Sequence, residues 1–272
     1  MATLTMVNGT NVLMDKFNSL GEFIDYANSN TRKLQSENGS QDNCMTASYA
    51  EAHSLAVNGW HDVRAEVEVM LDKLTEQIAD RFAIISSLEF ATSGGAVDVG
   101  RWLTGEPECM YSFTPTPSAR MGKVVKLFID YGASAVFSAE FIRQRGIVIL
   151  ALVDTLTKMG IACEVWGETA VTYGKGTHTT VVKMHDATSQ LDIDGLMFAL
   201  ANPSMLRRLT FSVRELADKA LPPSYGRTRQ MMFAKDYGAD IRIERLESSY
   251  DTMMTDPVKW VMSQVEGMEL VA

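Results

Sequence analysis

The chain has 272 residues, and its 46% hydrophobic and 22% charged content is that of an ordinary globular protein. A net charge of −9 excludes a general attraction to nucleic acid or anionic lipid, so either partner would need a local basic surface. No apolar run approaches the ~20 residues of a membrane span, and three scattered cysteines outside any CxxC pair argue against a disulfide framework.

We expect residues 1–118 to form a mainly helical N-terminal region that ends in a loop rich in glycine and proline. A short helix near its start is followed by the polar run 28–43, whose Ser, Asn and Gln content predicts a mobile loop. From 48 to 78, apolar residues recur at spacings of three and four, which indicates an amphipathic helix with an interruption at Asn58-Gly59. Residues 97–109 form a cluster rich in glycine, proline and acidic residues. Its single tryptophan, Trp102, either anchors this loop or serves in recognition.

Residues 119–220 are expected to hold an α/β core. Positions 124–129 form a β-branched and aromatic run, and 138–159 follow as a proline-free helix whose centre is apolar on every face. Gly160 supplies a helix stop before the next strand at 161–166. Strand, crossover helix and strand make a βαβ unit, which places a parallel sheet at the centre. The predicted fold class is therefore α/β, with a mostly parallel central sheet flanked by helices.

Later segments complete this core and add residues 221–272 as a small mixed extension. The polar content of 179–184 predicts a strand near an edge of the sheet, and 209–213 is predicted to be another strand. A short helix is expected at 191–200. Alternating apolar and charged residues at 240–246 predict a half-exposed strand, and a C-terminal amphipathic helix follows.

The sequence lacks the common catalytic motifs. It has no HExxH or GxSxG pattern, and Gly174-Lys175-Gly176-Thr177 lacks the first glycine of a P-loop, whose position is taken by Thr169. We therefore expect a binding protein rather than an enzyme. No cofactor is expected apart from a magnesium ion at one polar loop.

That polar loop follows the strand at 124–129 and contains Asp130 and Ser134. Open α/β sheets bind ligands at the carboxyl ends of their parallel strands, and carboxylate and hydroxyl oxygens are ligands of Mg²⁺. The loop is thus a candidate metal site. The alternative is that Asp130 caps the turn, with Gly132 permitting it.

The strand, loop and long helix resemble a von Willebrand factor A-type domain. In that family the strand ends in an Asp-x-Ser-x-Ser metal motif. The matching positions are Asp130, Gly132 and Ser134, with glycine in place of the first serine. The resemblance implies the same kind of fold and a protein-recruitment module, which can be metal-dependent and partnered with an AAA-type ATPase.

A wider stretch, about residues 45–215, resembles uncharacterised proteins of tailed bacteriophages and prophages. The segments that carry this resemblance are Gly59-Trp60, 97–109 and 145–153. It implies a viral protein that acts in the host cytoplasm with phage-encoded partners, or a virion or assembly component. The N-terminus lacks the form of a secretory signal, which agrees with an intracellular role.

Residues 206–246 form a locally basic stretch. Nine basic and five acidic side chains give it a net charge of +4, which leaves −13 for the rest of the chain. Cations can follow a phosphate backbone while rings stack on unpaired bases, so this mixture predicts a site for single-stranded nucleic acid. The candidate residues are Arg207, Arg208, Arg214, Tyr225, Arg227, Arg229, Phe233, Lys235 and Tyr237.

The alternative for this stretch is that its arginines neutralise neighbouring carboxylates and its rings belong to the core. The leading interpretation is a phage protein that binds single-stranded DNA and recruits replication or transcription proteins. Homo-oligomerisation is compatible with every interpretation.

Overall fold

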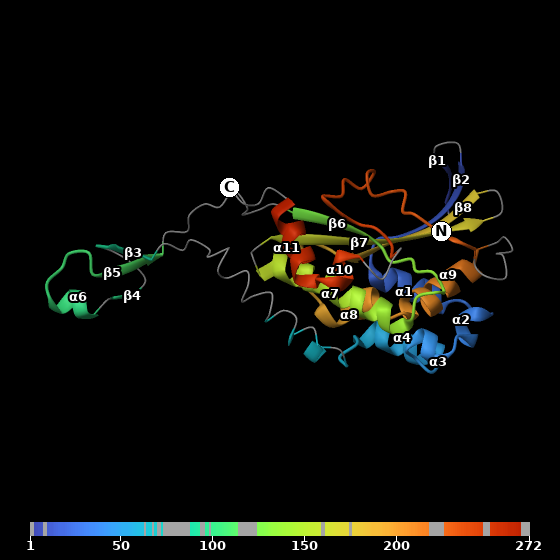
Figure 1. Cartoon of the computed structure of the whole chain (residues 1–272), viewed down its shortest axis with the longest axis horizontal. Helices are drawn as coiled ribbons and strands as arrows, with labels where there is room; N and C mark the ends of the chain where they lie inside the picture. The colour runs from blue at the N-terminus through green and yellow to red at the C-terminus, as the bar shows by residue number, and fades with distance from the viewer. Residues whose placement is uncertain are drawn as a thin grey trace.

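A computed structural model of the whole chain gives the architecture shown in Figure 1. The structure describes the following residues: 3–7, 10–62, 64–66, 68–69, 72, 88–92, 96–97, 99–113, 124–158, 161–173, 176–217, 226–246 and 251–267.

A seven-stranded mixed sheet forms the centre of the protein (Figure 1), and the predicted α/β class is confirmed. The strands lie in the order β1-β2-β8-β7-β6-β10, and the short β9 pairs with β7. β10, β6 and β7 run parallel to one another, as do β2 and β8, whereas the β1–β2, β7–β8 and β7–β9 pairs are antiparallel. The strand bounds are β1 Thr3–Val7, β2 Thr10–Phe17, β6 Val124–Asp130, β7 Ala162–Tyr173, β8 Gly176–His185, β9 Thr228–Arg229 and β10 Ile241–Ile243.

The βαβ unit predicted at the centre is confirmed. β6 and β7 are direct parallel neighbours, and the long helix α7 (Ala139–Lys158) connects them. The Ser138 hydroxyl accepts a hydrogen bond from the Phe141 amide at 3.2 Å, which satisfies one of the free donors at the start of the helix. Residues 147–153 are all buried, because α7 contacts β7, α8 (Ile193–Ala201), α10 (Thr252–Thr255) and α11 (Pro257–Gly267).

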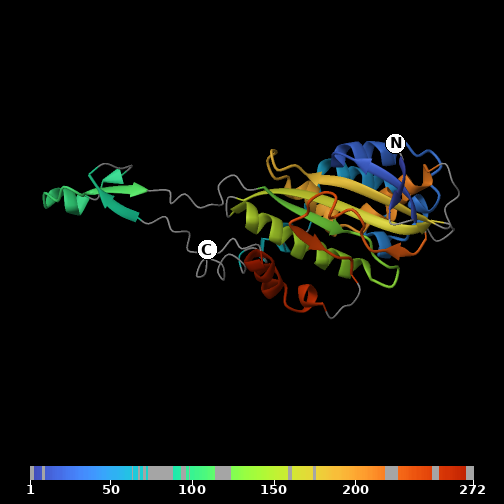
Figure 2. The same cartoon turned by 90° about the horizontal axis from the view of Figure 1, so that it is seen from above.

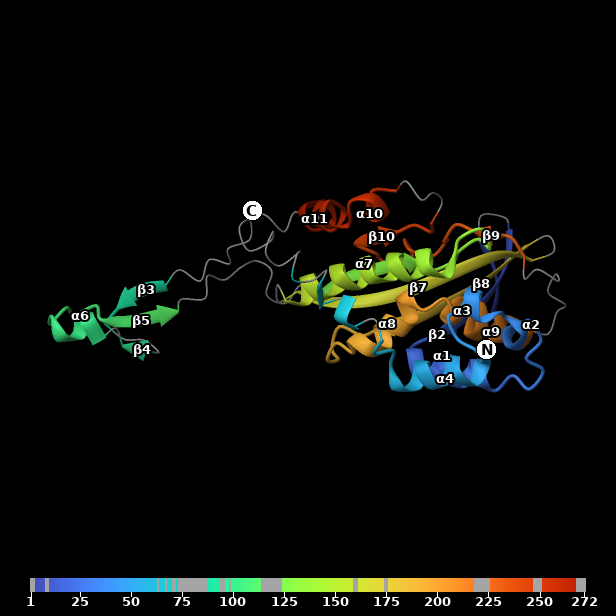
Figure 3. The ribbon, with the colours of Figure 1, turned by 60° about the horizontal axis from the view of Figure 1, so that its bottom comes forward.

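Helices cover one face of the sheet. Figure 3 shows α7, α8, α1 and α4 gathered on this side. They share one hydrophobic core with side chains of β2, β6, β7, β8 and β10. The other helices of this layer are α1 Leu20–Asn28, α4 Tyr49–Asn58, α8 Ile193–Ala201, the π-helix η1 Met205–Thr210 and α9 Phe211–Glu215.

The opposite face of the sheet is covered by residues 228–240, and we call it the strap face. A smaller hydrophobic cluster there joins Met231 and Phe233 to Phe128 and Trp166 of the sheet. The two C-terminal helices contact α7 instead, and their bounds are α10 Thr252–Thr255 and α11 Pro257–Gly267. None of the described helices is long and apolar enough to cross a membrane.

Residues 1–118 are not a mainly helical region apart from the core. β1 and β2 belong to the central sheet and α1 packs on it, because alternating residues of β2 such as Phe17 point into the same core. The polar run 28–43 is not a loop throughout, since it contains α2 Gln35–Asn38 and α3 Gln41–Cys44. The helix predicted beyond Gly59 lies largely outside the described residues.

Two predictions in the second half of the chain are wrong. Residues 209–213 are helical, because they fall in η1 and α9, where burial among helices overrides the β-propensity of their branched side chains. The strand β8 lies between β2 and β7 rather than near an edge. Its polar side chains have buried partners: His178 Nε2 lies 2.8 Å from Asp15 Oδ2 on the neighbouring β2.

Residues 88–113 contain a separate three-stranded antiparallel sheet with one short helix (Figure 2). The strand order is β3-β5-β4. The bounds are β3 Leu88–Ala91, β4 Ala96–Val97, α6 Val99–Leu103 and β5 Met110–Phe113. The cluster rich in glycine and proline therefore forms helix and strand within the described ranges, and Trp102 lies exposed on α6. At the other end of the chain, β9 and β10 of the segment 221–272 pair with the central sheet.

Gly146 fixes how closely α7 approaches α8. A Cβ atom there would lie 2.2 Å from the Leu200 carbonyl oxygen and 2.3 Å from the Ala201 Cα. We expect Gly146→Ala to lower the free energy of unfolding by ~1–3 kcal/mol, because overpacking against backbone outweighs the gain of ~1 kcal/mol in helix propensity. Urea unfolding measures the change. Gly267→Ala in α11, where a Cβ would meet nothing within 4 Å, is the matched control and should be neutral or slightly stabilising.

Candidate nucleic-acid interface

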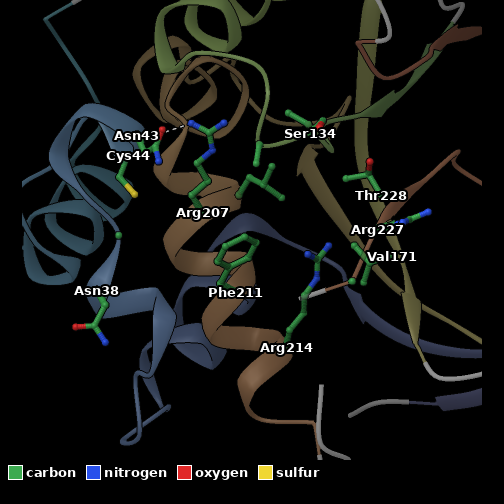
Figure 4. Close-up of a pocket in the computed structure, with 15 residues that line it drawn as sticks. Asn38, Asn43, Cys44, Ser134, Val171, Arg207, Phe211, Arg214, Arg227 and Thr228 are labelled. Carbon is green, nitrogen blue, oxygen red and sulfur yellow. Dashed lines mark hydrogen bonds between the residues drawn. The ribbon is translucent and has the colours of Figure 1, made fainter. Parts of the chain in front are cut away.

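The strand β9 places two exposed arginines on the strap face. The Arg227 carbonyl accepts a hydrogen bond from the Thr172 amide at 2.8 Å, and residues 228 and 229 pair with β7. Successive residues of a strand point to opposite faces, so Arg227 and Arg229 share one side while Thr228 points to the other. In Figure 4 the Arg227 side chain extends away from Phe211, which lies on the helical side of the sheet.

Both arginines remain available as cations. Arg229 Nη1 donates to Thr177 Oγ1 at 3.2 Å, which directs the guanidinium across β7 toward β8. Within the described ranges, neither Arg227 nor Arg229 forms an ion pair with a carboxylate. A guanidinium has five N–H donors, so each can still bind a phosphate with two parallel hydrogen bonds.

An aromatic ring and a lysine lie further along the strap face. Tyr237 packs on Trp166 with ring centroids 4.6 Å apart, and on Phe128 at 5.3 Å. The exposed Lys16 ammonium lies 5.1 Å from the centroid of the Tyr237 ring. Trp166 is only 5% exposed whereas Tyr237 is half-buried, so Tyr237 is the ring that a base can reach.

Two further lysines of the strap face, Lys235 and Lys183, differ in whether a carboxylate pairs with them. Lys235 is exposed in the segment that covers the sheet. Lys183 Nζ instead lies 2.8 Å from Asp186 Oδ2 and 3.4 Å from Glu164 Oε2. Within the described ranges, the cations of the strap face that form no ion pair are Lys16, Arg227, Arg229 and Lys235, and the exposed Asp236 follows Lys235 in the same segment.

Four of the predicted nucleic-acid residues do not belong to this surface. Phe233 is buried in the hydrophobic cluster under the strap. Arg207, Arg208 and Arg214 are 8%, 0% and 2% exposed, and they lie on the helical side of the sheet. Tyr225 lies outside the described residues. The nine candidates therefore do not share one surface, because η1 and α9 lie on the helical side of the sheet whereas the side chains of Arg229 and Tyr237 lie on the strap face.

Arg208 has a structural role instead. Its guanidinium makes five hydrogen bonds of 2.8–3.0 Å to the segment that carries α2 and α3. Four go to the backbone carbonyls of Ser36, Glu37, Gly39 and Thr46, and the fifth goes to the Thr46 hydroxyl. A buried cation saturated in this way cannot serve an external ligand.

Arg207 and Arg214 line a cavity of about 750 Å³ on the helical side (Figure 4). It lies next to Ser134 and Val171, near the carboxyl ends of β6 and β7. The sequence pointed to Ser134 and to these two arginines separately, and the fold brings them to one concave site.

The predicted metal loop has a different geometry from the motif it resembles. Asp130 is fully buried, and its Oδ1 accepts a hydrogen bond from the Gly132 amide at 2.9 Å, as the turn-capping alternative expects. Burial raises the pKa of Asp130 to about 7, opposed by the Gly132 hydrogen bond and by Arg145. Glycine at 132 supplies no hydroxyl and burial favours the uncharged carboxyl, so these residues do not fit the motif's magnesium site.

Metal-ligand groups are also scarce in the wider neighbourhood. Within the described ranges, no group of three or more His, Cys, Asp or Glu side chains could hold a metal ion. Ser134 lines the cavity, and its hydroxyl accepts a long hydrogen bond of 3.4 Å from the Val136 amide.

Glu168 is a structural residue of the strap face that sequence reasoning missed. Its carboxylate accepts hydrogen bonds from the amides of Met232 and Phe233 at 3.0 Å and from the Thr179 hydroxyl at 2.9 Å. Burial raises the pKa of Glu168, and these three donors lower it. The only sequence signal was an acid in the middle of a buried apolar strand. Glu168 fixes the segment that carries Lys235 and Tyr237 to the sheet.

Asp130 should make stability depend on pH. The folded protein holds the Asp130 proton up to a pKa of about 7, well above that of an unfolded carboxyl, so the wild-type free energy of unfolding should fall as pH rises from ~4 to ~7. Asp130→Asn keeps the oxygen that Gly132 binds and lacks the charge. The unfolding free energy of the variant relative to wild type should therefore rise by ~1–3 kcal/mol between pH 5 and pH 8. Urea unfolding at both pH values measures it, and a pH-independent difference would contradict the assignment.

Comparison with known proteins places the chain in one family. A family model described as "Domain of unknown function (DUF7192)" matches residues 3–268. No curated protein matches the chain, and no solved structure does. The match covers both the central sheet and the three-stranded unit. The chain therefore belongs to the DUF7192 family.

Proposed function

We propose that the protein is a non-enzymatic binding protein that holds single-stranded nucleic acid, in particular DNA, on the strap face. The observation that carries the proposal is that Arg227 and Arg229 are exposed on one side of β9, without an ion pair to a described carboxylate. Lys16 and the ring of Tyr237 lie on the same face. This is the combination of cations and a stacking ring that unpaired nucleotides require.

The charge of the whole chain decides what kind of binding this is. With a net charge of −9, the protein as a whole repels a polyanion. The favourable electrostatic contribution to the binding free energy must therefore come from the few local cations, and the affinity must be sensitive to salt. A single strand can bend to place phosphates at separate guanidinium groups and can turn a base onto Tyr237. A duplex keeps its bases stacked inside, so it gains only the phosphate contacts. A preference for single strands follows.

The resemblance to phage and prophage proteins supplies the biological setting of this proposal. The protein acts in the cytoplasm of the bacterial host, where it recruits phage-encoded replication or transcription proteins to the bound strand. Self-association on the strand is compatible with this role.

The proposal is tested by fluorescence anisotropy of a labelled single-stranded oligonucleotide and of a duplex of equal length, at 50 and 200 mM salt. Wild type should prefer the single strand and weaken as salt rises. The double substitution Arg227→Ala/Arg229→Ala should weaken binding at least tenfold at 50 mM salt. It should also reduce the slope of log affinity against log salt by about 1.4, or ~0.7 for each phosphate that the protein no longer neutralises.

The matched control is Arg32→Ala/Lys259→Ala, which removes two exposed positive charges from other elements. It should leave affinity within about threefold, because screening reduces the effect of distant charges. Equal reductions of affinity in both double variants would show that only net charge matters, and the proposed interface would be wrong.

A second candidate function, protein recruitment, is supported by one observation on the three-stranded unit. Trp102 and Leu103 of α6 are 63% and 72% exposed, and Val97 is 46% exposed. Neighbouring exposed apolar side chains of this size commonly mark a contact with another protein. This role corresponds to the recruitment module that the von Willebrand A-type resemblance implies, with an AAA-type ATPase as one candidate partner, and it is compatible with a virion or assembly component.

Affinity capture tests the second candidate. Proteins from infected cells that are retained by wild type should not be retained by the Trp102→Ser/Leu103→Ser variant, because the anchor residues of an interface carry most of its binding energy. Val136→Ser, at a valine that is 89% exposed on another part of the chain, is the control and should retain them. Retention of the same proteins by all three forms would contradict a recruitment role for α6.

A further inference from the structure

The cavity on the helical side of the sheet is separate from the strap face, and we infer that it binds a nucleotide. It is lined by three arginines, two hydroxyl side chains and an apolar wall, and none of the described residues that line it is acidic. The inference rests on Arg207 and Arg214, because the side chain of the third arginine, Arg227, extends away from Phe211 in Figure 4 and Arg229 does not line the cavity. Figure 4 shows the residues concerned.

Arg207 supplies a positive charge at one end of the cavity, and Ser134 supplies a hydroxyl group there. Arg207 donates to the backbone carbonyls of Asn43 at 2.6 Å and Phe137 at 2.8 Å, and within the described ranges no carboxylate pairs with it. Burial lowers the pKa of Arg207, but a guanidinium stays charged at neutral pH. A partly buried cation held by carbonyl dipoles alone gains more from an anion than an exposed one, because screening is weaker there.

Arg214 supplies a second cation at the other side of the space. Its Nη2 donates to Thr169 Oγ1 at 3.1 Å, and the guanidinium carbon lies 5.8 Å from the centroid of the Phe211 ring. In Figure 4 the guanidinium of Arg214 points toward the interior, between Phe211 and Val171. An anion with several oxygens, such as a phosphate, can use the planar donors of a guanidinium in pairs.

The size and place of the cavity fit a ligand larger than phosphate. Its volume of about 750 Å³ is in the range of pockets that hold a small organic molecule. It lies beside the carboxyl end of β6, just past Asp130, which is where open α/β sheets bind ligands. One wall is the π-helix η1, and π-helical turns occur frequently at functional sites.

The apolar wall explains why the organic part should be flat. Phe211, Val171 and Leu206 line this wall, and Phe211 is half-buried with its ring beside the Arg214 guanidinium. A ring and a guanidinium plane are the two surfaces on which a nucleobase stacks. A sugar phosphate would use the arginines through its phosphate but would not stack on this pair.

The facing wall offers hydrogen bonds for the edge of a base. Asn38 and Asn43 carry exposed amides there, and Asn38 Nδ2 donates to the Leu34 carbonyl at 2.6 Å, which leaves its Oδ1 as an acceptor. Arg208 holds this wall in place through its hydrogen bonds to the backbone of Gly39 and Thr46. Amides at the edge of the cavity supply donors and acceptors of the kind that the edge of a base requires.

Isothermal titration with adenosine 5′-monophosphate, cytidine 5′-monophosphate, ribose 5-phosphate and inorganic phosphate tests the inference. Wild type should bind at least one of the two nucleotides at least tenfold more tightly than ribose 5-phosphate. Ala135→Trp, at an exposed residue that lines the cavity, should weaken nucleotide binding at least tenfold by filling the space. Val136→Trp, at the exposed neighbour that does not line it, should bind as wild type does.

Each other outcome overturns a defined part of the inference. No binding of any of the four compounds at millimolar concentration would exclude a nucleotide site. Equal affinity for nucleotides and ribose 5-phosphate would exclude base recognition and leave an anion site. Unchanged nucleotide binding in Ala135→Trp would place the site elsewhere. Phe211→Leu should remove the preference for nucleotides while leaving ribose 5-phosphate affinity unchanged, and the comparison of ligands on wild type decides the question if that variant does not fold.

The same variants separate this site from the strap face. Ala135→Trp should leave the affinity for a single-stranded oligonucleotide within about threefold. Arg229→Ala should weaken oligonucleotide binding and leave nucleotide affinity within the same limit, because Arg229 does not line the cavity. Loss of both affinities in either variant would show that the two ligands share one site, which would overturn the nucleotide inference as a separate activity.

Discussion

The five hydrogen bonds of Arg208 hold together the part of the protein where the N-terminal helices meet η1. A buried guanidinium costs several kcal/mol unless its donors are satisfied. Here four backbone carbonyls and one hydroxyl of residues 36–46 satisfy them all, so the cation and the irregular segment each require the other. Glu215 acts in parallel: its carboxylate accepts from the amides of Leu34 and Ser36. Two buried charges thus fix a polar segment that has few apolar residues of its own.

Adjacent arginines in η1 show how the backbone separates structure from binding. Arg208 is enclosed by its five hydrogen bonds to residues 36–46, whereas Arg207 lines the cavity and donates to two carbonyls, those of Asn43 and Phe137. In a π-helix the chain turns more slowly per residue, and Thr210 reinforces this turn by donating to the Met205 carbonyl at 2.9 Å. All five N–H donors of Arg208 are used in hydrogen bonds within the fold, whereas Arg207 keeps N–H donors that can bind an anion.

The fold could be predicted from the sequence where apolar patterns were strong, as in the unit β6–α7–β7, whose long buried helix has no other interpretation. It could not be predicted where burial depends on distant partners: Thr210 and Val213 indicated a strand, and the polar β8 indicated an edge. The candidate sites were predicted in part. Residue type indicated that Arg207 and Arg229 could bind anions, but nothing local shows that Arg208 is enclosed or that Arg227 and Arg214 lie on opposite sides of a sheet. The groups that accept hydrogen bonds from Arg208 and donate them to Glu168 are mostly backbone groups. Every residue type has such groups, so a sequence pattern does not predict these hydrogen bonds.

The two residues of β9 belong to both sides of the sheet at once. Thr228 forms part of the cavity wall, and the chain continues within five residues to the amides of Met232 and Phe233 that Glu168 holds. β9 pairs with β7 through two residue pairs only, and short pairings of this kind open at a low cost in free energy. Any change of affinity that a ligand beside Thr228 causes at Arg229 must, by thermodynamic linkage, be matched by an equal change in the other direction.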